Sequence, residues 1–414
     1  MRLSGRSIVA VTVLVGVAAL VVVGRSYQAR RAVRESFSNT VAVNVTNGAD
    51  RGAGTLREAL FLVATAPGPA RITLQVPKIS LLTALPPIVN AHGVRIVARQ
   101  GGSEIDAGAL SGGGPVLDVA AANVSLDGLA IRNCANAAIL VRAVHFSLES
   151  TTLEGCDVGV DVAENAHDLL LEGNRFVNDR VGVRFTGSSP DTTVAANQFS
   201  GAKDAGVWAV RGQPDLDAAA ITVRDNRFDD DHAGVVAGNL NILIEQNQIT
   251  GAQSSAIDLV GAGVVVRGNH VSGGSGMGVI ADGAHAVLIE RNELHGLTAY
   301  GIMVRGSSGV VVSGNRLYDC AYGIAFVLGD ARNPSTAVDN TIIEPRYDGI
   351  DVMGDAPILR RNQVVMPHAF ALRVADFERP DGSRVAGAPF LDHNSFGPPV
   401  ANKVAALRGR SLRQ

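Results

Sequence analysis

The sequence is poor in aromatic residues, which make up 4% of its 414 residues and include a single Trp. Protein interiors are close-packed, so a core with few rings must be filled by aliphatic side chains. Hydrophobic residues as a class are nevertheless abundant, at 46%. This composition excludes a wide core filled by aromatic rings and indicates a narrow, aliphatic interior.

Positive charge is scarce outside the N-terminus. Residues 1–34 hold six of the 36 basic residues and no acidic residue, which leaves 30 basic against 39 acidic groups in residues 35–414. A general nucleic-acid binder needs a basic surface to neutralise phosphates. We therefore expect no nucleic-acid partner, and no broadly basic surface for a polyanionic glycan. We also expect no cofactor and no metal site.

What the sequence does contain is an internal repeat of about 23 residues, a period typical of solenoid proteins. Each copy has two or three short runs of alternating Val and Ile, separated by Gly, Asn and Ser, which is typical of strands and turns. The L-x-x-L-x-L frame of leucine-rich repeats is missing. The marker position, usually Asn, is occupied by Leu129, Thr151, Asn174, Asn197, Asn226, Asn247, Asn269, Asn292, Asn315, Asn340 and Asn362.

The repeat predicts an all-β chain folded as a parallel β-helix solenoid of about 11 or more coils. It resembles the right-handed β-helix repeats of the pectin-lyase-like superfamily, a resemblance that implies a right-handed coil. Coils stacked about 4.8 Å apart place equivalent residues in columns. We expect each marker Asn to adopt the left-handed corner and to bond the Asn above and below. In the Gly-Ile-x-Val segment, Gly should serve a turn, Ile and Val should point inward, and x should point outward.

The N-terminal residues 1–34 predict a membrane anchor. An apolar run from Ile8 to Val23 is flanked by Arg on both sides, and no clear A-x-A cleavage site follows it. The resemblance implies an exported body, so we expect a single-pass protein of the bacterial inner membrane with its body in the periplasm, or secreted if the segment is cleaved. More Arg lies after the run than before it, which fits a cytoplasmic body instead.

The next segment, residues 35–70, predicts a strand and a capping helix. Its V-T-N…D-x-G-x-G-T-L-R-x-A-L stretch resembles the opening of secreted bacterial β-helix proteins. Thr55 and Glu58 form a capping box, and an apolar helix face would cover the open end of the solenoid without chemistry of its own. That face consists of Leu56, Ala59, Leu60 and Val63. Coils should then fill residues 71–376, with a closing segment and tail in 377–414.

The three cysteines fall at one position of the repeat. Cys134 and Cys156 belong to adjacent coils, so a separation near 4.8 Å suits a disulfide. A packed column of free thiols explains the same spacing. Cys320 lies eight coils further on and cannot join them.

Candidate binding and catalytic residues lie on the outward x column and close to it. Trp208 beside Arg184 could form a platform for a sugar ring, unless a loop covers the Trp, and Asp351 is a further substrate-binding candidate. Asp258, Asp282 and Arg305 could supply a base and a charge stabiliser for β-elimination or epimerisation of a uronate. A surface ion pair between Asp282 and Arg305 is the simpler explanation of those two residues.

The sequence lacks the D-P-H signature of uronate epimerases and the N-T-D and G-H-G blocks of polygalacturonases. The acidic run Asp229–His232 lies in a turn, where acidic residues are ordinary. Two functions therefore stay open. One is a membrane-anchored extracytoplasmic protein that binds or processes a polysaccharide, as a lyase or epimerase if it is catalytic. The other is a non-catalytic β-helix scaffold, or an adhesion or export factor of the cell envelope.

Overall fold

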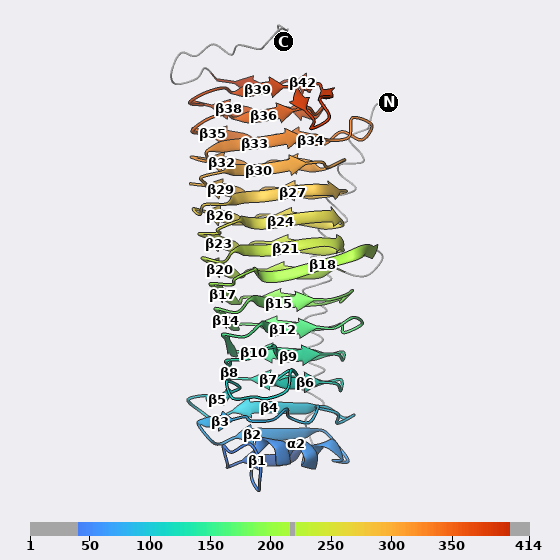
Figure 1. Ribbon diagram of the computed structural model, residues 1–414, viewed down its shortest axis with the longest axis vertical. Coiled ribbons are helices and arrows are strands. Elements are labelled where there is room, and N and C mark those ends of the chain that lie inside the picture. Colours follow the sequence, from blue (N-terminus) through green and yellow to red (C-terminus); the bar gives the residue numbers. More distant parts are fainter. Residues whose placement is uncertain (1–39, 216–219, 398–414) are drawn as a thin grey trace.

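The structure, a computed structural model that describes residues 40–215 and 220–397, is a parallel β-helix with three long sheets (Figure 1). Each regular coil runs through one strand of the first, the second and the third sheet in turn. All pairing within these sheets is parallel; a short hairpin, β40 (Phe377–Glu378) with β41 (Arg384–Val385), is antiparallel. The predicted all-β parallel β-helix is confirmed.

The first sheet has 15 strands. They are β1 (Val41–Val45), β2 (Ala70–Leu74), β4 (Val94–Ala98), β7 (Val124–Asp127), β10 (Phe146–Glu149), β13 (Leu170–Glu172), β16 (Thr193–Ala195), β19 (Ile221–Arg224), β22 (Ile242–Glu245), β25 (Val264–Arg267), β28 (Leu288–Glu290), β31 (Val311–Ser313), β34 (Thr336–Val338), β37 (Ile358–Arg360) and β42 (Phe390–Asp392).

The second sheet has 14 strands. They are β3 (Lys78–Ser80), β5 (Ser103–Asp106), β8 (Leu129–Arg132), β11 (Thr152–Glu154), β14 (Arg175–Val177), β17 (Gln198–Ser200), β20 (Arg227–Asp229), β23 (Gln248–Thr250), β26 (His270–Ser272), β29 (Glu293–His295), β32 (Arg316–Tyr318), β35 (Thr341–Ile343), β38 (Gln363–Val365) and β43 (Ser395–Phe396).

The third sheet, which carries the x column, has 12 strands. They are β6 (Leu117–Val119), β9 (Ala137–Val141), β12 (Val158–Val162), β15 (Val181–Phe185), β18 (Ala205–Asp215), β21 (Ala233–Leu240), β24 (Ser255–Ala262), β27 (Met277–His285), β30 (Tyr300–Arg305), β33 (Tyr322–Val327), β36 (Ile350–Met353) and β39 (Leu372–Ala375).

The marker asparagines form a continuous ladder at the corner between the first and second sheets. Asn292 shows the pattern: its Oδ1 accepts from the backbone N–H and the side-chain amide of Asn269, and its Nδ2 donates to Asn315 Oδ1. The ladder runs one coil further than predicted, to Asn394. Buried amides are costly unless they are bonded, so this reciprocal pairing explains why Asn recurs there.

The predicted left-handed conformation of these asparagines is wrong by one residue. The positive φ belongs to the residue before each Asn, for example Gln246 (54°) and Arg291 (54°). The chain turns at that residue, and the following Asn can then direct its amide inward to its neighbours.

The predicted turn role of the Gly in Gly-Ile-x-Val is also wrong, because this Gly lies within a third-sheet strand. A Cβ on Gly182 would lie 2.5 Å from the carbonyl oxygen of Gly206 and 2.7 Å from the Phe199 ring. The position therefore needs Gly because the core leaves no room for a methyl group.

The interior is aliphatic except for one stack of rings. Phe176, Phe199 and Phe228 follow one another up the second sheet with 4.6 Å between ring centroids. Val and Ile flanking the x position point inward as predicted, since Val235 and Ile257 are fully buried. One hydrophobic core extends from Val45 to Val364.

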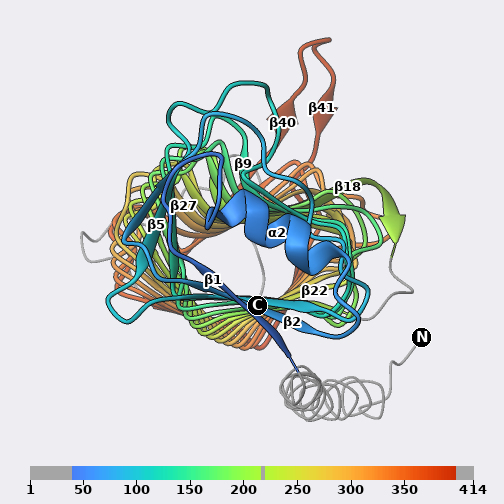
Figure 2. The ribbon, with the colours of Figure 1, turned by 90° about the horizontal axis from the view of Figure 1, so that it is seen from below.

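Helix α2 (Leu56–Ala64) lies across the N-terminal end of the coil, as Figure 2 shows. Thr55 accepts the N–H of Glu58, and the four predicted apolar residues are buried. The preceding loop is fixed by Asp50, which accepts from Arg57 at 2.8 Å and from the backbone N–H groups of Leu82 and Thr83. Asp50 and Arg57 thus hold the N-terminal coils together.

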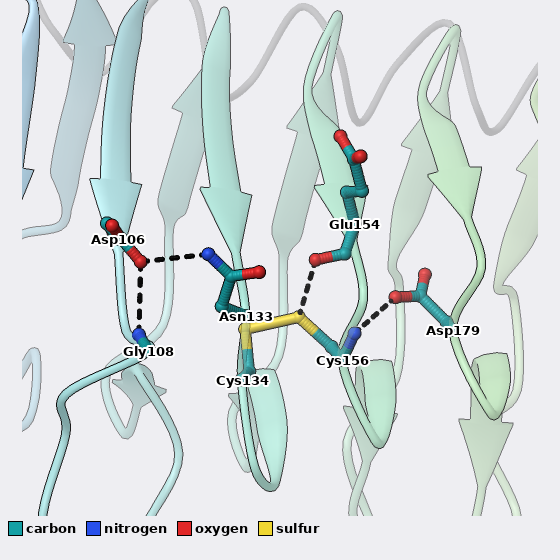
Figure 3. The surroundings of a disulfide bond; sticks show 7 residues. All are labelled: Asp106, Gly108, Asn133, Cys134, Glu154, Cys156 and Asp179. Carbon is teal, nitrogen blue, oxygen red and sulfur yellow. Dashed lines mark hydrogen bonds between the residues drawn. A yellow bond between two sulfur atoms is a disulfide. The ribbon is translucent and has the colours of Figure 1, made fainter.

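Cys134 and Cys156 form a disulfide between adjacent coils (Figure 3), which decides between the two possibilities for this pair. Cys320 is buried and free. The column continues with Asp179, whose carboxylate accepts the backbone N–H of Cys156 at 2.8 Å.

The predicted anchor, residues 1–34, lies outside the described residues. Within residues 40–215 and 220–397, no helix combines the length and the apolar character needed to span a membrane.

Candidate functional site

The x residues form one column along the outer face of the third sheet, as predicted. Backbone pairing places each x residue beside its equivalent in the next coil without a shift in register. The column reads Leu140, Asp161, Arg184, Trp208, Val236, Asp258, Ile280, Met303, Ala325, Asp351 and Arg373.

Arg184 and Trp208 are adjacent, but the arginine is already engaged. Arg184 makes a bidentate ion pair with Asp161, with contacts of 2.9 and 2.6 Å. Trp208 is 37% exposed, so no loop covers it completely. Trp208 can therefore still contact a ligand, whereas Arg184 would have to give up two charge-assisted hydrogen bonds to do so.

Asp258, Asp282 and Arg305 lie close together on β24, β27 and β30. Arg305 and Asp282 form a bidentate ion pair in which both side chains are at least 40% exposed. This hydrogen bonding lowers the pKa of Asp282. Burial raises the pKa of Asp258, the Asp282 charge adds to that effect, and Arg305 opposes it. Of these two carboxyls, Asp258 therefore keeps its proton to the higher pH.

Asp351 belongs to a third cluster, six coils from Trp208 along the column and so about 29 Å away at about 4.8 Å per coil. Its side chain is 1% exposed, and neither carboxylate oxygen has a hydrogen-bond partner of good geometry among the described residues. Burial raises its pKa to about 6. Arg373 Nη1 lies 3.7 Å from both Asp351 and Asp348.

Sequence reasoning missed Asp348, Arg373 and Tyr300 in this cluster. Tyr300 and Tyr322 are paired in register three residues before x, and their rings stack with centroids 4.6 Å apart. Asp351 raises the pKa of Tyr300, which burial already raises, to about 12. The recurrence of Tyr at the same repeat position was the available signal.

A further expectation concerns the acidic run Asp229–His232. Within the run Asp229–His232, Asp231 is buried and accepts the N–H of Ala202 at 2.7 Å, a structural role. In the described part of the chain, no group of three or more His, Cys, Asp or Glu is arranged to hold a metal ion.

The family follows from the repeat. A family model described as "Right handed beta helix region" matches residues 88–220 and 215–364, which together cover more than half of the chain. The chain belongs to the right-handed β-helix family. The predicted right hand of the coil agrees with this assignment. No protein in a curated set matches the sequence.

Solved structures of right-handed β-helix proteins resemble this chain in fold. The catalytic unit of an α-1,3-glucanase from Streptomyces thermodiastaticus is 15% identical, with a TM-score of 0.53, over 86% of this chain and 69% of that one. A mutant of the tailspike protein of E. coli bacteriophage HK620, solved with a hexasaccharide, is 14% identical, with a TM-score of 0.57, over 85% of this chain and 78% of that one. A PL6 alginate lyase, solved with a trisaccharide, is 12% identical, with a TM-score of 0.51, over 80% and 85%.

Proposed function

We propose that the protein binds an extended polysaccharide along the outer face of the third sheet, between Arg184 and Arg373. The observation that carries this proposal is the unbroken column over nine strands, in which a partly exposed Trp and carboxylates share one face and the apolar residues between them are themselves buried. Sugar rings offer apolar faces and polar edges, so such a column matches both. The two relatives in fold that were solved with oligosaccharides support this choice of ligand.

Within this proposal, Asp258 transfers a proton on the bound glycan and Arg305 stabilises the negative charge that develops. Asp258 makes no hydrogen bond or ion pair within the described residues and has a raised pKa, whereas Asp282 is held by Arg305. Asp282 therefore positions the guanidinium. An acid or base with a pKa closer to neutral is the more effective catalyst.

We further propose that residues 1–34 anchor the body outside the cytoplasm. The disulfide between Cys134 and Cys156 supports this, because disulfides persist in oxidising compartments.

A non-catalytic scaffold is the second candidate. The bidentate pairs Asp161–Arg184 and Asp282–Arg305 favour it, since each neutralises charge that catalysis would use. Both candidates require the protein to bind a polysaccharide, and only the first requires it to convert that polysaccharide to a product.

The test uses the purified full-length protein with uronate-containing and neutral polysaccharides. Binding is measured by calorimetry, and turnover by unsaturated ends or altered sugar composition. Trp208→Ala should weaken binding about tenfold, equivalent to about 1.4 kcal/mol, because the only large exposed ring of the column is lost. Asp258→Asn should abolish turnover and leave binding intact.

The matched control is Val311→Ala, which shortens a side chain of similar exposure (36%) on the first sheet and should change nothing. Binding of wild-type strength in Trp208→Ala would remove the proposed face. Binding without turnover by the wild type would establish the scaffold.

A further inference from the structure

The tyrosines of the described chain are confined to one region of the surface. Tyr300, Tyr318, Tyr322 and Tyr347 all lie between residues 300 and 347, in consecutive coils. Three of them form a ladder: the Tyr300 and Tyr322 rings stack at 4.6 Å, and the Tyr322 and Tyr347 rings at 5.0 Å. The ladder stands at the edge of the third sheet where the chain enters β30 and β33.

The ladder ends with an open ring. Tyr347 is 53% exposed, and among residues 40–215 and 220–397 only Tyr322 stacks on it. One face of the Tyr347 ring is therefore covered and the other is accessible. A tyrosine ring stacked on a neighbouring ring is already ordered, so this side chain loses little conformational entropy when a ligand packs on it.

Arg373, which contacts Asp348 and Asp351 just after Tyr347 in the chain, lacks, among the residues described, the hydrogen bonds that other arginines of this face make. Arg184 and Arg305 on the same sheet, and Arg142 directly after β9, each make two hydrogen bonds to an Asp of the preceding coil. Arg373 is 47% exposed and makes no hydrogen bond in the described part of the chain; its contacts with Asp348 and Asp351 are ion pairs at 3.7 Å. It also lies on β39, the last strand of the sheet. Its five N–H donors are available to a ligand.

An acceptor, the Asp351 carboxylate, and a donor, the Arg373 guanidinium, both have hydrogen-bonding capacity left at this place. Asp351 lies beneath Arg373 and is 1% exposed, and within the described residues neither of its carboxylate oxygens has a hydrogen-bond partner of good geometry. The Tyr300 hydroxyl is near enough to lower its pKa, against the larger effect of burial. Buried polar groups are normally satisfied, so a carboxylate as buried as Asp351 without a well-aligned hydrogen bond is exceptional, and the half-exposed Arg373 beside it has donors that can reach a ligand. A sugar hydroxyl both accepts and donates, so it can bond Arg373 while the ring packs on Tyr347.

The charges select the class of sugar. A single guanidinium faces two carboxylates, Asp348 and Asp351, which leaves no spare positive charge for a uronate. An added anion here would be repelled. We propose that Tyr347 and Arg373, with Asp348 and Asp351 positioning the guanidinium, form a subsite for an uncharged sugar unit at the C-terminal end of the third sheet. This inference rests on the proposed polysaccharide function and narrows its ligand.

The test titrates the full-length protein with neutral hexasaccharides (cellohexaose, laminarihexaose and maltohexaose) and with an alginate hexasaccharide. At least one neutral hexasaccharide should bind more tightly than the alginate one. Tyr347→Ala and Arg373→Gln should each raise its Kd about tenfold or more. Tyr347→Phe keeps the ring face and should stay within about threefold of wild type.

The matched control is Tyr318→Ala, which removes a tyrosine stacked on His295 on the second sheet and should leave the Kd unchanged. Thermal unfolding of each variant is measured alongside, and Tyr347→Phe identifies any loss due to misfolding. Wild-type affinity in both Tyr347→Ala and Arg373→Gln, together with weaker binding in Trp208→Ala, would overturn the subsite and leave the polysaccharide function standing. Tighter binding of the alginate hexasaccharide would overturn the assignment of an uncharged sugar, and binding of no hexasaccharide would overturn both.

Discussion

At the scale of single residues, the buried carboxyl of Asp179, which continues the column of Cys134 and Cys156, shows how the stability of this fold responds to pH. Asp179 is 1% exposed, and burial raises its pKa to about 8, while its hydrogen bond from Cys156 opposes the shift. Its folded pKa lies above the ordinary value of 3.8. The folded protein therefore binds this proton more tightly than the unfolded chain does, and stability falls as the pH rises from about 4 to about 8.

Asp179→Asn should stabilise the protein at pH 8 and have little effect at pH 4. The amide keeps an acceptor for the N–H of Cys156 but never ionises. We expect the midpoint of thermal unfolding to rise by at least about 2 °C at pH 8, a change of about 1 kcal/mol in a domain of this size. Glu344→Gln, at an exposed acid, should shift neither midpoint. A larger gain at pH 4 than at pH 8 would contradict the assignment.

At the scale of elements, the asparagine ladder links each coil to the next through hydrogen bonds between buried side-chain amides, which water does not reach. An interior member such as Asn292 receives two hydrogen bonds from one neighbour and donates to the other neighbour and to the carbonyl of Val266. Asn394, at the end, receives the same two but donates only to the carbonyl of Leu359.

Asn292→Ala should therefore cost more stability than Asn394→Ala. Truncation leaves buried donors of Asn269 without an acceptor, and each such orphan costs roughly 1–3 kcal/mol. We expect a loss of about 2–4 kcal/mol for Asn292→Ala and about half of that for the partly exposed end. Urea unfolding measures both, with the m-value as a check on the transition. Equal losses at the two positions would show that the additional hydrogen bond from Asn292 to Asn315 contributes no stability.

At the scale of the whole molecule, the rigid column fixes how long a ligand can be engaged. From Trp208 to Asp351 the column extends over six coils, about 29 Å at about 4.8 Å per coil. A short oligosaccharide reaches one cluster only, whereas a chain long enough to span the column meets all of them on one preorganised surface.

Affinity should therefore rise with oligosaccharide length and level off once the ligand spans the column. Calorimetry with a size series from disaccharide to decasaccharide tests this, and the gain with length should disappear in Trp208→Ala. The same affinity for a disaccharide and a decasaccharide would confine binding to a single subsite.

The candidate site could be predicted in part because its column follows from the repeat. Period-two alternation placed Asp258 and Asp351 in the same outward column, and the coil spacing brought Asp282 beside Arg305. Cys134 and Cys156 had to be neighbours for the same reason. Arg373 was missed because its importance lies in a missing hydrogen bond, and the repeat alone gives no sign of that.

The sequence by itself determined the sheets, the inward and outward faces and the asparagine corner, because a repeat of about 23 residues can bury its apolar positions only by stacking on copies of itself. Tertiary structure alone decided the rest. Gln246 and Arg291 carry the left-handed turn rather than the asparagines, Gly182 yields space to a ring of the next coil, and Asp351 is covered while Trp208 is not. Each of these depends on the atoms that neighbouring coils place against a residue, and such contacts are fixed only when the coils pack.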